Sequence, residues 1–273
     1  MTPEDTEKLQ KFLRSFAGDT RPLLLLDYDG TLAPFRLDRH QARPWSGVRE
    51  LLVEIRRQGR TRMAAITGRP AGEIAPLLGI DPPLEVWGLH GVERLYPDGR
   101  RELEQFPPVA REKLEELRAL LKRDSFGGRF EDKVNAAVMH WRGASPRYAK
   151  LIEQKTRELF EPLAHLGGLE LLEFEAGLEL RVGRNKGGAV AAILQEAGCW
   201  GPVAFLGDDI TDEPAFHAVN SLGSPGLSVL VRRQHRETEA NVWLRPPVEL
   251  RRFLKAWFAA CTRNYQLQHI KAM

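Results

Sequence analysis

The chain has 273 residues, of which 42% are hydrophobic and 28% charged, and no apolar run approaches the roughly 20 residues of a membrane-spanning helix. This composition is typical of a soluble globular protein, so we expect no membrane association. Basic and acidic residues, 40 and 37 in number, are interspersed and do not indicate nucleic-acid binding, and two cysteines are too few for a disulfide framework.

The first predicted elements are a charged N-terminal helix and a buried strand. Residues 1–16 (MTPEDTEKLQKFLRSF) predict an amphipathic helix rather than a signal sequence, so we expect a cytoplasmic protein. The run 22–26 (PLLLL) is short and apolar, which is typical of a strand buried on both faces of a parallel sheet. The residue that follows this strand is Asp27.

Two further apolar runs repeat this pattern. A helix is predicted at 46–58 and a strand at 63–66, which ends at Thr67. Downstream, a helix at 187–197 precedes a strand at 202–206. This alternation predicts an α/β fold with a doubly wound parallel-sheet core. Because open α/β sheets bind ligands at the carboxyl ends of their strands, we expect the polar residues there to converge on one site.

A segment of different character, 106–183, separates the two halves of the core. It combines predicted helices at 111–123 and 146–163 with short predicted strands. This mixture indicates a small α+β domain inserted into a larger one. We therefore expect a core formed by 1–105 and 184–273 that carries the inserted domain.

The loop after the first strand, 27–32 (DYDGTL), carries two carboxylates two positions apart. Carboxylates attack phosphoryl groups to form an aspartyl phosphate, and magnesium neutralises charge as the phosphate approaches. One of Asp27 and Asp29 can act as the nucleophile while the other moves protons. The alternative is a surface turn, because Asp and Gly favour turns.

A second acidic cluster, 207–213 (GDDITDE), places four acidic residues in seven positions directly after another apolar strand. Crowded carboxylates repel each other unless a cation lies between them, and magnesium prefers such oxygen ligands. The cluster therefore predicts a magnesium site, with a solvated acidic helix start as the alternative. The roles of Asp209, Asp212 and Glu213 stay open between ligands, supporting partners and helix-start charges.

Two further groups have the chemistry of phosphate ligands. Thr67, Gly68 and Arg69 supply a hydroxyl, a flexible backbone amide and a positive charge at a helix start, although a threonine helix cap explains them equally well. Lys186 at the next helix start can neutralise both a nucleophile and a transferring phosphate. The alternative for Lys186 is a solvated lysine.

In this order of motifs the chain resembles the haloacid dehalogenase (HAD) superfamily of phosphatases over most of its core. The resemblance implies a HAD-like Rossmannoid core, with Asp27 as nucleophile and Asp29 as general acid and base. It implies that Thr67 and Lys186 bind phosphate, and that Asp27, Asp208 and the carbonyl of Asp29 bind Mg²⁺. Dehalogenation is disfavoured, because the dehalogenases of that superfamily lack a second aspartate like Asp29.

The inserted segment resembles the cap of one family within this superfamily. Its position between Thr67 and Lys186 corresponds to the type-two cap. The segments FEDK, HWR and LELR of the insertion, with GLHGVE and GDDITDE of the core, resemble the trehalose-6-phosphate phosphatases. The resemblance implies that Glu131, Lys133 and Glu179 hold the sugar hydroxyls, which need such donors and acceptors. The alternative is an exposed charge pair between Glu131 and Lys133.

The expected activity is magnesium-dependent hydrolysis of trehalose 6-phosphate to trehalose and phosphate through an aspartyl-phosphate intermediate. Trehalose-6-phosphate synthase is a candidate functional partner. The alternatives are a phosphatase for another sugar phosphate, such as sucrose or mannosyl-glycerate phosphate, a phosphomutase, and an inactive sugar-phosphate-binding partner of a synthase. His90, His140 and Arg142 are left without a catalytic assignment.

Overall fold

The protein divides into two compact units. The computed structural model describes residues 1–16, 21–36, 38–123, 128–174, 176–196, 201–222 and 225–271. The larger unit comprises Met1–Leu103 and Arg184–Met273, and the smaller unit comprises Glu104–Gly183. Each unit has a sheet of its own, so each is described separately below.

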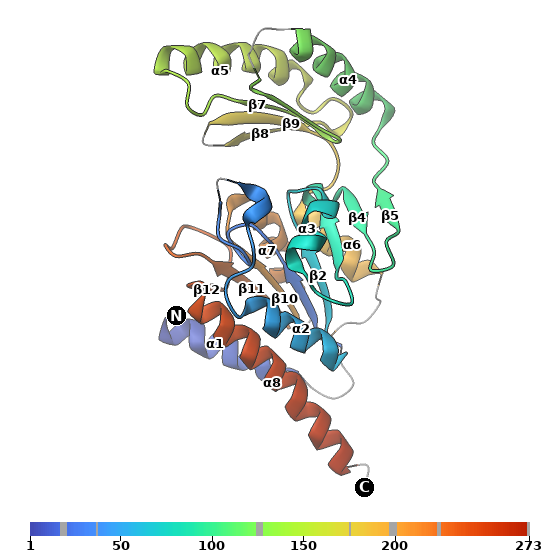
Figure 1. The fold of residues 1–273 in the computed structure, drawn as a ribbon, viewed down its shortest axis with the longest axis vertical. Coiled ribbons are helices and arrows are strands. Elements are labelled where there is room, and N and C mark those ends of the chain that lie inside the picture. Colours follow the sequence, from blue (N-terminus) through green and yellow to red (C-terminus); the bar gives the residue numbers. More distant parts are fainter. Residues whose placement is uncertain are drawn as a thin grey trace. The chain divides into compact units, whose positions relative to one another are not determined.

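An eight-stranded sheet forms the centre of the larger unit, in the order β12-β11-β10-β1-β2-β3-β4-β5 (Figure 1). Its strands are β1 (Leu23–Leu26), β2 (Arg62–Ile66), β3 (Glu85–Gly88), β4 (Glu93–Leu95), β5 (Arg101–Leu103), β10 (Val203–Gly207), β11 (Gly226–Val231) and β12 (Val242–Leu244). The central strand β1 pairs in parallel with β10 on one side and with β2 on the other. The carboxyl ends of the three predicted strands therefore lie next to one another.

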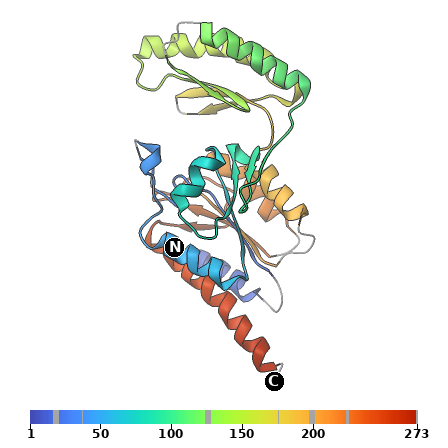
Figure 2. The ribbon, with the colours of Figure 1, turned by 45° about the vertical axis from the view of Figure 1, so that its right-hand side comes forward.

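Helices cover both faces of this sheet (Figures 1 and 2). They are α1 (Pro3–Arg14), α2 (Val48–Gln58), α3 (Ala71–Leu78), α6 (Lys186–Gln195), α7 (Glu213–Asn220) and α8 (Val248–Lys271). Leu24 and Leu26 of β1 belong to a hydrophobic cluster with α1, α2, α3 and α8, whereas Leu23 and Leu25 belong to a second cluster with α6 and α7. Successive side chains of a strand point to opposite faces, so an unbroken leucine run suits a strand covered on both.

The predicted fold class, α/β with a doubly wound core and a separate smaller α+β unit, is confirmed. The sheet is not wholly parallel, however, because β4 pairs antiparallel with both β3 and β5 at its edge. The physical reason is the length of their connections. Only the 3₁₀ turn η2 (Leu89–Gly91) and Val92 join β3 to β4, and a parallel pairing needs a crossover of about a dozen residues.

The smaller unit is a four-stranded antiparallel sheet, in the order β6-β7-β9-β8, with two helices on one face. Its elements are α4 (Pro108–Arg123), β6 (Phe130–Lys133), β7 (Ala136–His140), α5 (Pro146–Phe160), β8 (Glu170–Phe174) and β9 (Gly177–Arg181). Met139 and Leu178 face the helices in a hydrophobic cluster. By the alternation along each strand, Glu131, Lys133 and Glu179 occupy the opposite, helix-free face of the sheet.

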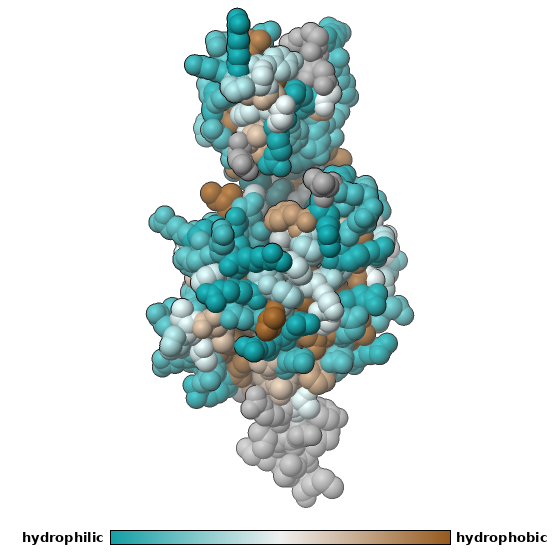
Figure 3. All heavy atoms as spheres, turned by 60° about the vertical axis from the view of Figure 1, so that its left-hand side comes forward, coloured by the Kyte–Doolittle hydropathy of each residue, from teal (hydrophilic) through white to brown (hydrophobic). Residues whose placement is uncertain are grey.

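The surface of the described residues is mainly polar, and Figure 3 shows one such face with hydrophobic residues in scattered spots. Among the described residues, the most exposed large hydrophobic side chains are Phe35 and Ile210, each 69% exposed. Phe35 lies in the loop after β1, and Ile210 begins a 3₁₀ turn (Ile210–Asp212) after β10. Within the described ranges, no helix combines the length and the apolar character needed to cross a membrane.

Trp257 of α8 closes the hydrophobic cluster between α8 and α1. It is fully buried, its ring centroid lies 4.8 Å from that of Phe16, and its indole N–H donates to Thr61 Oγ1 at 3.0 Å. Trp257→Ala is expected to lower the free energy of unfolding by about 3–5 kcal/mol, because it leaves a large cavity. Phe258→Ala, at a half-buried position, should cost only about 1–2 kcal/mol in the same urea titrations. Equal losses would contradict this packing role.

Candidate active site

Three predicted residues meet at the carboxyl edge of the large sheet. Asp27, Thr67 and Asp208 directly follow β1, β2 and β10, and they are 3%, 1% and 4% exposed. The backbone N–H of Asp27 donates to the carbonyl of Leu206 at 2.9 Å, so the pairing of β1 with β10 continues into the loop. The strand order therefore brings together residues that are far apart in the sequence.

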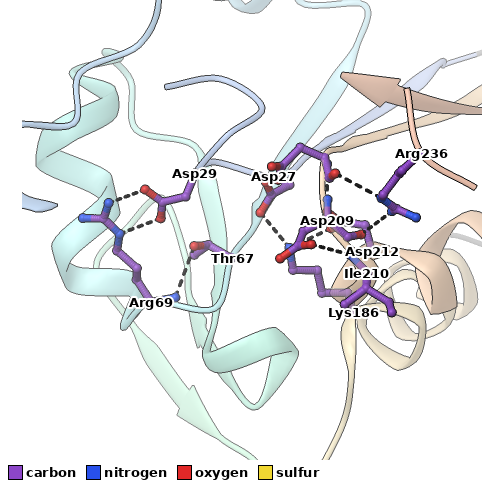
Figure 4. Close-up of polar contacts among 10 residues, drawn as sticks. Asp27, Asp29, Thr67, Arg69, Lys186, Asp209, Ile210, Asp212 and Arg236 are labelled. Atoms are coloured by element: carbon purple, nitrogen blue, oxygen red, sulfur yellow. Dashed lines mark hydrogen bonds and ion pairs between the residues drawn. The ribbon is translucent and has the colours of Figure 1, made fainter. Parts of the chain in front are cut away.

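Lys186 links the two acidic clusters. Its ammonium donates to Asp27 Oδ1 and to Asp212 Oδ1, each at 2.7 Å (Figure 4). Lys186 begins α6, where the Asn185 side chain accepts from the N–H of Gly188 at 2.9 Å and fixes the helix start. Burial alone would lower the pKa of Lys186, but the charges of Asp212 and Asp27 outweigh it and raise that pKa. Lys186 is therefore a buried ammonium rather than a solvated lysine.

Asp212 holds the second acidic loop in place. Its Oδ2 accepts from the backbone N–H groups of Asp208 at 2.9 Å and Asp209 at 3.0 Å, and the residue is fully buried. A Cβ at Gly207 would lie 2.4 Å from the Asp212 carboxyl carbon, which explains the glycine at this position. Asp209 Oδ1 accepts from the N–H of Ile210 at 2.8 Å and caps the 3₁₀ turn η5 (Ile210–Asp212). Two residues whose roles the sequence left open thus support the loop.

The buried carboxylates form a candidate metal centre. Asp27, Asp208 and Asp212 each offer an oxygen within 4.8 Å of the others, and Asp27 Oδ2 is buried without a hydrogen-bond partner among the described residues. Because both oxygens of Asp212 already accept hydrogen bonds, Asp27 and Asp208 are the residues that suit a hard divalent cation. The backbone at Gly30 passes against this site, since a Cβ there would lie 2.0 Å from Asp208 Oδ2.

The ionisation of the two carboxylates agrees with this assignment. Burial, partly offset by the charge of Lys186, raises the pKa of Asp27 to about 7. Burial and the neighbouring charges of Asp27 and Asp212 raise the pKa of Asp208 to about 9. A divalent cation favours the ionised carboxylates and so displaces protons from the site.

Asp29 lies apart from this cluster. Its side chain is directed to Arg69, whose Nε donates to Asp29 Oδ2 at 2.6 Å and whose Nη2 donates to Oδ1 (Figure 4). Nη1 of Arg69 donates to the carbonyl of Arg39 at 2.7 Å. The predicted contact between Arg69 and phosphate stays a prediction, as does the contact between the Asp29 carbonyl and a metal.

The loop of Thr67 and Gly68 is fixed by contacts with the segment after β3. The N–H of Thr67 donates to the carbonyl of Trp87 at 2.8 Å, and Thr67 Oγ1 accepts from the N–H of Arg69 at 3.2 Å. A Cβ at Gly68 would lie 2.8 Å from the ring of His90, whose own N–H donates to the Thr67 carbonyl at 2.8 Å. His90, left without an assignment above, therefore helps to shape this loop.

Two arginines that were not predicted from the sequence lie beside Asp208. Arg232 Nη1 and Arg236 Nε donate to the carbonyl of Asp208 at 3.2 and 3.4 Å, and Arg236 Nη2 donates to the carbonyl of Asp209 at 2.7 Å. Arg236 also forms an ion pair with Glu213. Both arginines follow β11, another parallel strand next to β10. The rule that polar residues converge at strand ends would have found them.

In the smaller unit, the predicted sugar ligands share one face of the sheet. Lys133 Nζ lies 2.8 Å from Glu179 Oε2, and Glu131 Oε2 lies 3.0 Å from His140 Nε2. Lys133 lies on β6 and Glu179 on β9, and both strands pair with the intervening strand β7, so the Lys133–Glu179 contact spans three strands. Glu131 and Lys133 thus have partners on other strands, unlike the simple pair considered from the sequence.

Comparison with known proteins finds relatives over most of the chain. A family model described as trehalose-phosphatase matches residues 25–245. A trehalose-phosphate phosphatase from Mycolicibacterium paratuberculosis is 28% identical over 239 residues, 84% of this chain and 59% of that relative. The chain thus spans less than two thirds of that protein. A trehalose-6-phosphate phosphatase-related protein from Thermoplasma acidophilum is also 28% identical, over 85% of this chain and 95% of its own length.

A solved structure shows the same fold. It is crystal form 3 of the trehalose-6-phosphate phosphatase from Aspergillus fumigatus, with a TM-score of 0.69 at 28% identity. The similarity covers 93% of this chain and 97% of the fungal chain. It therefore includes residues of both units.

Without a divalent cation, the protein is expected to lose stability as pH rises. The folded-state pKa values of Asp27 and Asp208 lie above the roughly 3.9 of an unfolded aspartate. The contribution of these two protonated carboxyl groups to the free energy of unfolding is fully present below that value. It is lost as pH rises through about 7 for Asp27 and through about 9 for Asp208. With chelator, the melting temperature should fall by about 5–10 °C between about pH 5.5 and about pH 8.5.

Excess Mg²⁺ should recover most of this loss at the higher pH, because a cation binds the ionised carboxylates. Asp208→Asn should reduce both the pH dependence and the response to the cation. A wild-type melting temperature that stays constant over this interval, with chelator and with Mg²⁺, would contradict the assignment.

Gly30→Ala is expected to weaken Mg²⁺ binding by at least about tenfold, because the new Cβ would collide with the Asp208 carboxylate. Gly99→Ala is the matched control, since Gly99 also has a positive φ, +87°, but nothing within 4 Å of its Cβ position. Both variants carry a backbone strain of about 1–2 kcal/mol. Titration calorimetry of both variants with Mg²⁺ separates the effect of backbone strain from that of the collision with Asp208. Equal Mg²⁺ affinities of the two variants would contradict the collision.

Proposed function

Since the chain belongs to the trehalose-phosphatase family of the HAD superfamily, we propose that it hydrolyses trehalose 6-phosphate to trehalose and phosphate with Mg²⁺. Family membership implies a sugar-phosphate substrate. The observation that carries the proposal is the state of Asp27. One of its oxygens is held by Lys186 at 2.7 Å, while the other is buried without a hydrogen-bond partner among the described residues.

In the proposed first step, Asp27 Oδ2 attacks the phosphorus atom. An Asp27–phosphorus bond forms, the bond from phosphorus to the sugar oxygen breaks, and Asp29 donates a proton to that oxygen. Lys186 keeps Asp27 oriented through its other oxygen. Asp27, Asp208 and the Asp29 carbonyl would hold Mg²⁺, whose positive charge would reduce the repulsion between carboxylate and phosphate.

In the second step, water attacks the phosphorus atom of the aspartyl phosphate. Asp29 accepts a proton from that water, the Asp27–phosphorus bond breaks, and phosphate is released. Asp29 thus returns to its protonated form, and the two steps balance. The Thr67 hydroxyl, the Gly68 amide and Lys186 are the proposed phosphate ligands, because they offer donors at the carboxyl edge of the sheet.

The helix-free face of the smaller sheet is proposed to recognise the sugar. Glu131, Lys133 and Glu179 lie on that face, where the contacts with His140 and between Lys133 and Glu179 hold their polar groups in fixed positions. Carboxylates accept hydrogen bonds from sugar hydroxyls, and the ammonium donates them. Preorganised groups of this kind lose less conformational entropy when a ligand binds.

The proposed activity is tested by phosphate release from trehalose 6-phosphate, sucrose 6-phosphate and glucose 6-phosphate, with Mg²⁺ and with chelator. We expect a strong preference for the first, abolished by chelation. Asp27→Asn should lower kcat by at least about 10³-fold, because it removes the nucleophile. Asp98→Asn, at an exposed turn, is the control and should retain activity.

The outcomes separate the alternatives. Metal-dependent phosphate release from a different sugar phosphate would support the chemistry proposed for the larger unit, but it would contradict trehalose 6-phosphate as the substrate. Near-normal turnover by Asp27→Asn would refute the covalent step. Binding of trehalose 6-phosphate without release would favour a binding protein, an alternative that the buried contact of Asp27 with Lys186 argues against.

Glu131→Ala tests sugar recognition separately. We expect kcat/KM for trehalose 6-phosphate to fall at least about tenfold, and kcat/KM for an aryl phosphate to change less than about threefold, because only the sugar uses this contact. Glu112→Ala, an exposed carboxylate on α4 of the same unit, is the matched control. Equal losses on both substrates would count against a sugar ligand.

A further inference from the structure

The guanidinium of Arg69 is the most heavily engaged group beside Asp29. Nε and Nη2 donate to the two carboxylate oxygens of Asp29, and Nη1 donates to the carbonyl of Arg39 at 2.7 Å. The side chains of Arg69 and Asp29 are 11% and 23% exposed. A two-pronged pair of this kind fixes the plane of a carboxylate as well as its distance, which a lysine cannot do.

Arg69 is itself fixed from two sides. Its carbonyl accepts from the N–H of Leu89 at 2.9 Å, and its N–H donates to Thr67 Oγ1 at 3.2 Å. Its guanidinium carbon lies 5.8 Å from the ring centroid of Tyr28, whose hydroxyl donates to the carbonyl of Ala42 at 2.6 Å. The Arg69 guanidinium is therefore held in a defined position by Asp29, the Arg39 carbonyl and the Tyr28 ring.

The contacts with Arg69 leave part of the Asp29 carboxylate accessible, since its side chain is 23% exposed. A carboxylate has about four lone-pair positions, and the contacts from Arg69 use two of them. The remaining positions are available to a leaving oxygen or to a water molecule. Three of the five guanidinium N–H donors of Arg69 have partners within the protein, and two of these three are directed to Asp29, so Asp29 is the main partner of this side chain.

We propose that Arg69 is a positioning residue for the reaction, acting on substrate through Asp29 rather than by contact with phosphate. This inference rests on the proposed function, because it assigns Arg69 to the proton-transfer half of that reaction. It replaces the phosphate role expected from the sequence. The consequence is that loss of Arg69 affects the substrates that depend on proton donation by Asp29.

Leaving groups distinguish the two roles. A sugar alkoxide needs a proton as it departs, whereas an aryl oxide such as 4-nitrophenolate departs without one. Arg69→Gln should therefore lower kcat/KM for trehalose 6-phosphate by at least about tenfold and for 4-nitrophenyl phosphate by less than about threefold. Asp29→Asn should give the same pattern with a larger loss on the sugar. Inhibition by inorganic phosphate should be unchanged in Arg69→Gln.

Two further variants complete the experiment. Arg69→Lys keeps the charge without the planar guanidinium, so its kcat/KM for trehalose 6-phosphate should lie between those of wild type and Arg69→Gln. It replaces Arg69→Gln as the test if circular dichroism shows that Arg69→Gln does not fold. Arg49→Gln removes the same charge from an exposed position of the same unit and should match wild type. An equal loss on both substrates, with weaker phosphate inhibition, would overturn the inference in favour of a phosphate contact.

Unaltered kinetics of Arg69→Gln on both substrates would overturn the inference as well. Failure of the wild type to hydrolyse either phosphate is a different result, since it would refute the proposed function and remove the basis of this inference with it. Wild-type activity with the wrong pattern in Arg69→Gln refutes the role of Arg69 alone.

Discussion

The buried contact of Lys186 with Asp27 and Asp212 is the interaction on which the rest of the site depends. Two carboxylates and one ammonium are less than 5% exposed, and Asp208 adds a third carboxylate nearby. Charges buried at this depth are costly unless they are paired. When Asp27 and Asp212 are both ionised, the group has one more negative charge than its ammonium can balance, and Asp27 reaches this state as pH rises through about 7. A divalent cation bound here would supply the missing charge, so the raised pKa values of Asp27 and Asp208 and the expected metal dependence have the same electrostatic origin.

The fold pairs these buried charges by bringing together segments that are far apart in the sequence. Asp27 and Lys186 are separated by 159 positions in the sequence, and they meet because β1 and β10 are neighbours while α6 begins at the same edge of the sheet. Glycines occur where there is no room for a side chain, at Gly30 against Asp208 and at Gly207 against Asp212. The acidic loops are thus positioned by backbone packing as much as by hydrogen bonds.

Sequence patterns predicted the parts of the structure that depend on periodicity and strand ends. The leucine run of β1 and the residues Asp27 and Asp208 belong to this group. The edge strands β4 and β5 were missed because each has only three residues, two charged and one leucine, which is too short a run to show alternation. The partner of Asp29 depends on how two loops approach each other, which local sequence does not determine. Arg232 directly follows β11, so the expectation that polar residues at strand ends converge also applies to it.

The leucine strand β1 has one more consequence. Because its alternate side chains belong to different hydrophobic clusters, β1 packs against both layers of helices. Neither layer can separate from the sheet without exposing leucines of the strand that ends at Asp27. The larger unit should therefore open as one cooperative block, with the β1 amides among the slowest to exchange with deuterated water. Local opening is then confined to the rim of the unit, while Asp27 is anchored in the last region to unfold.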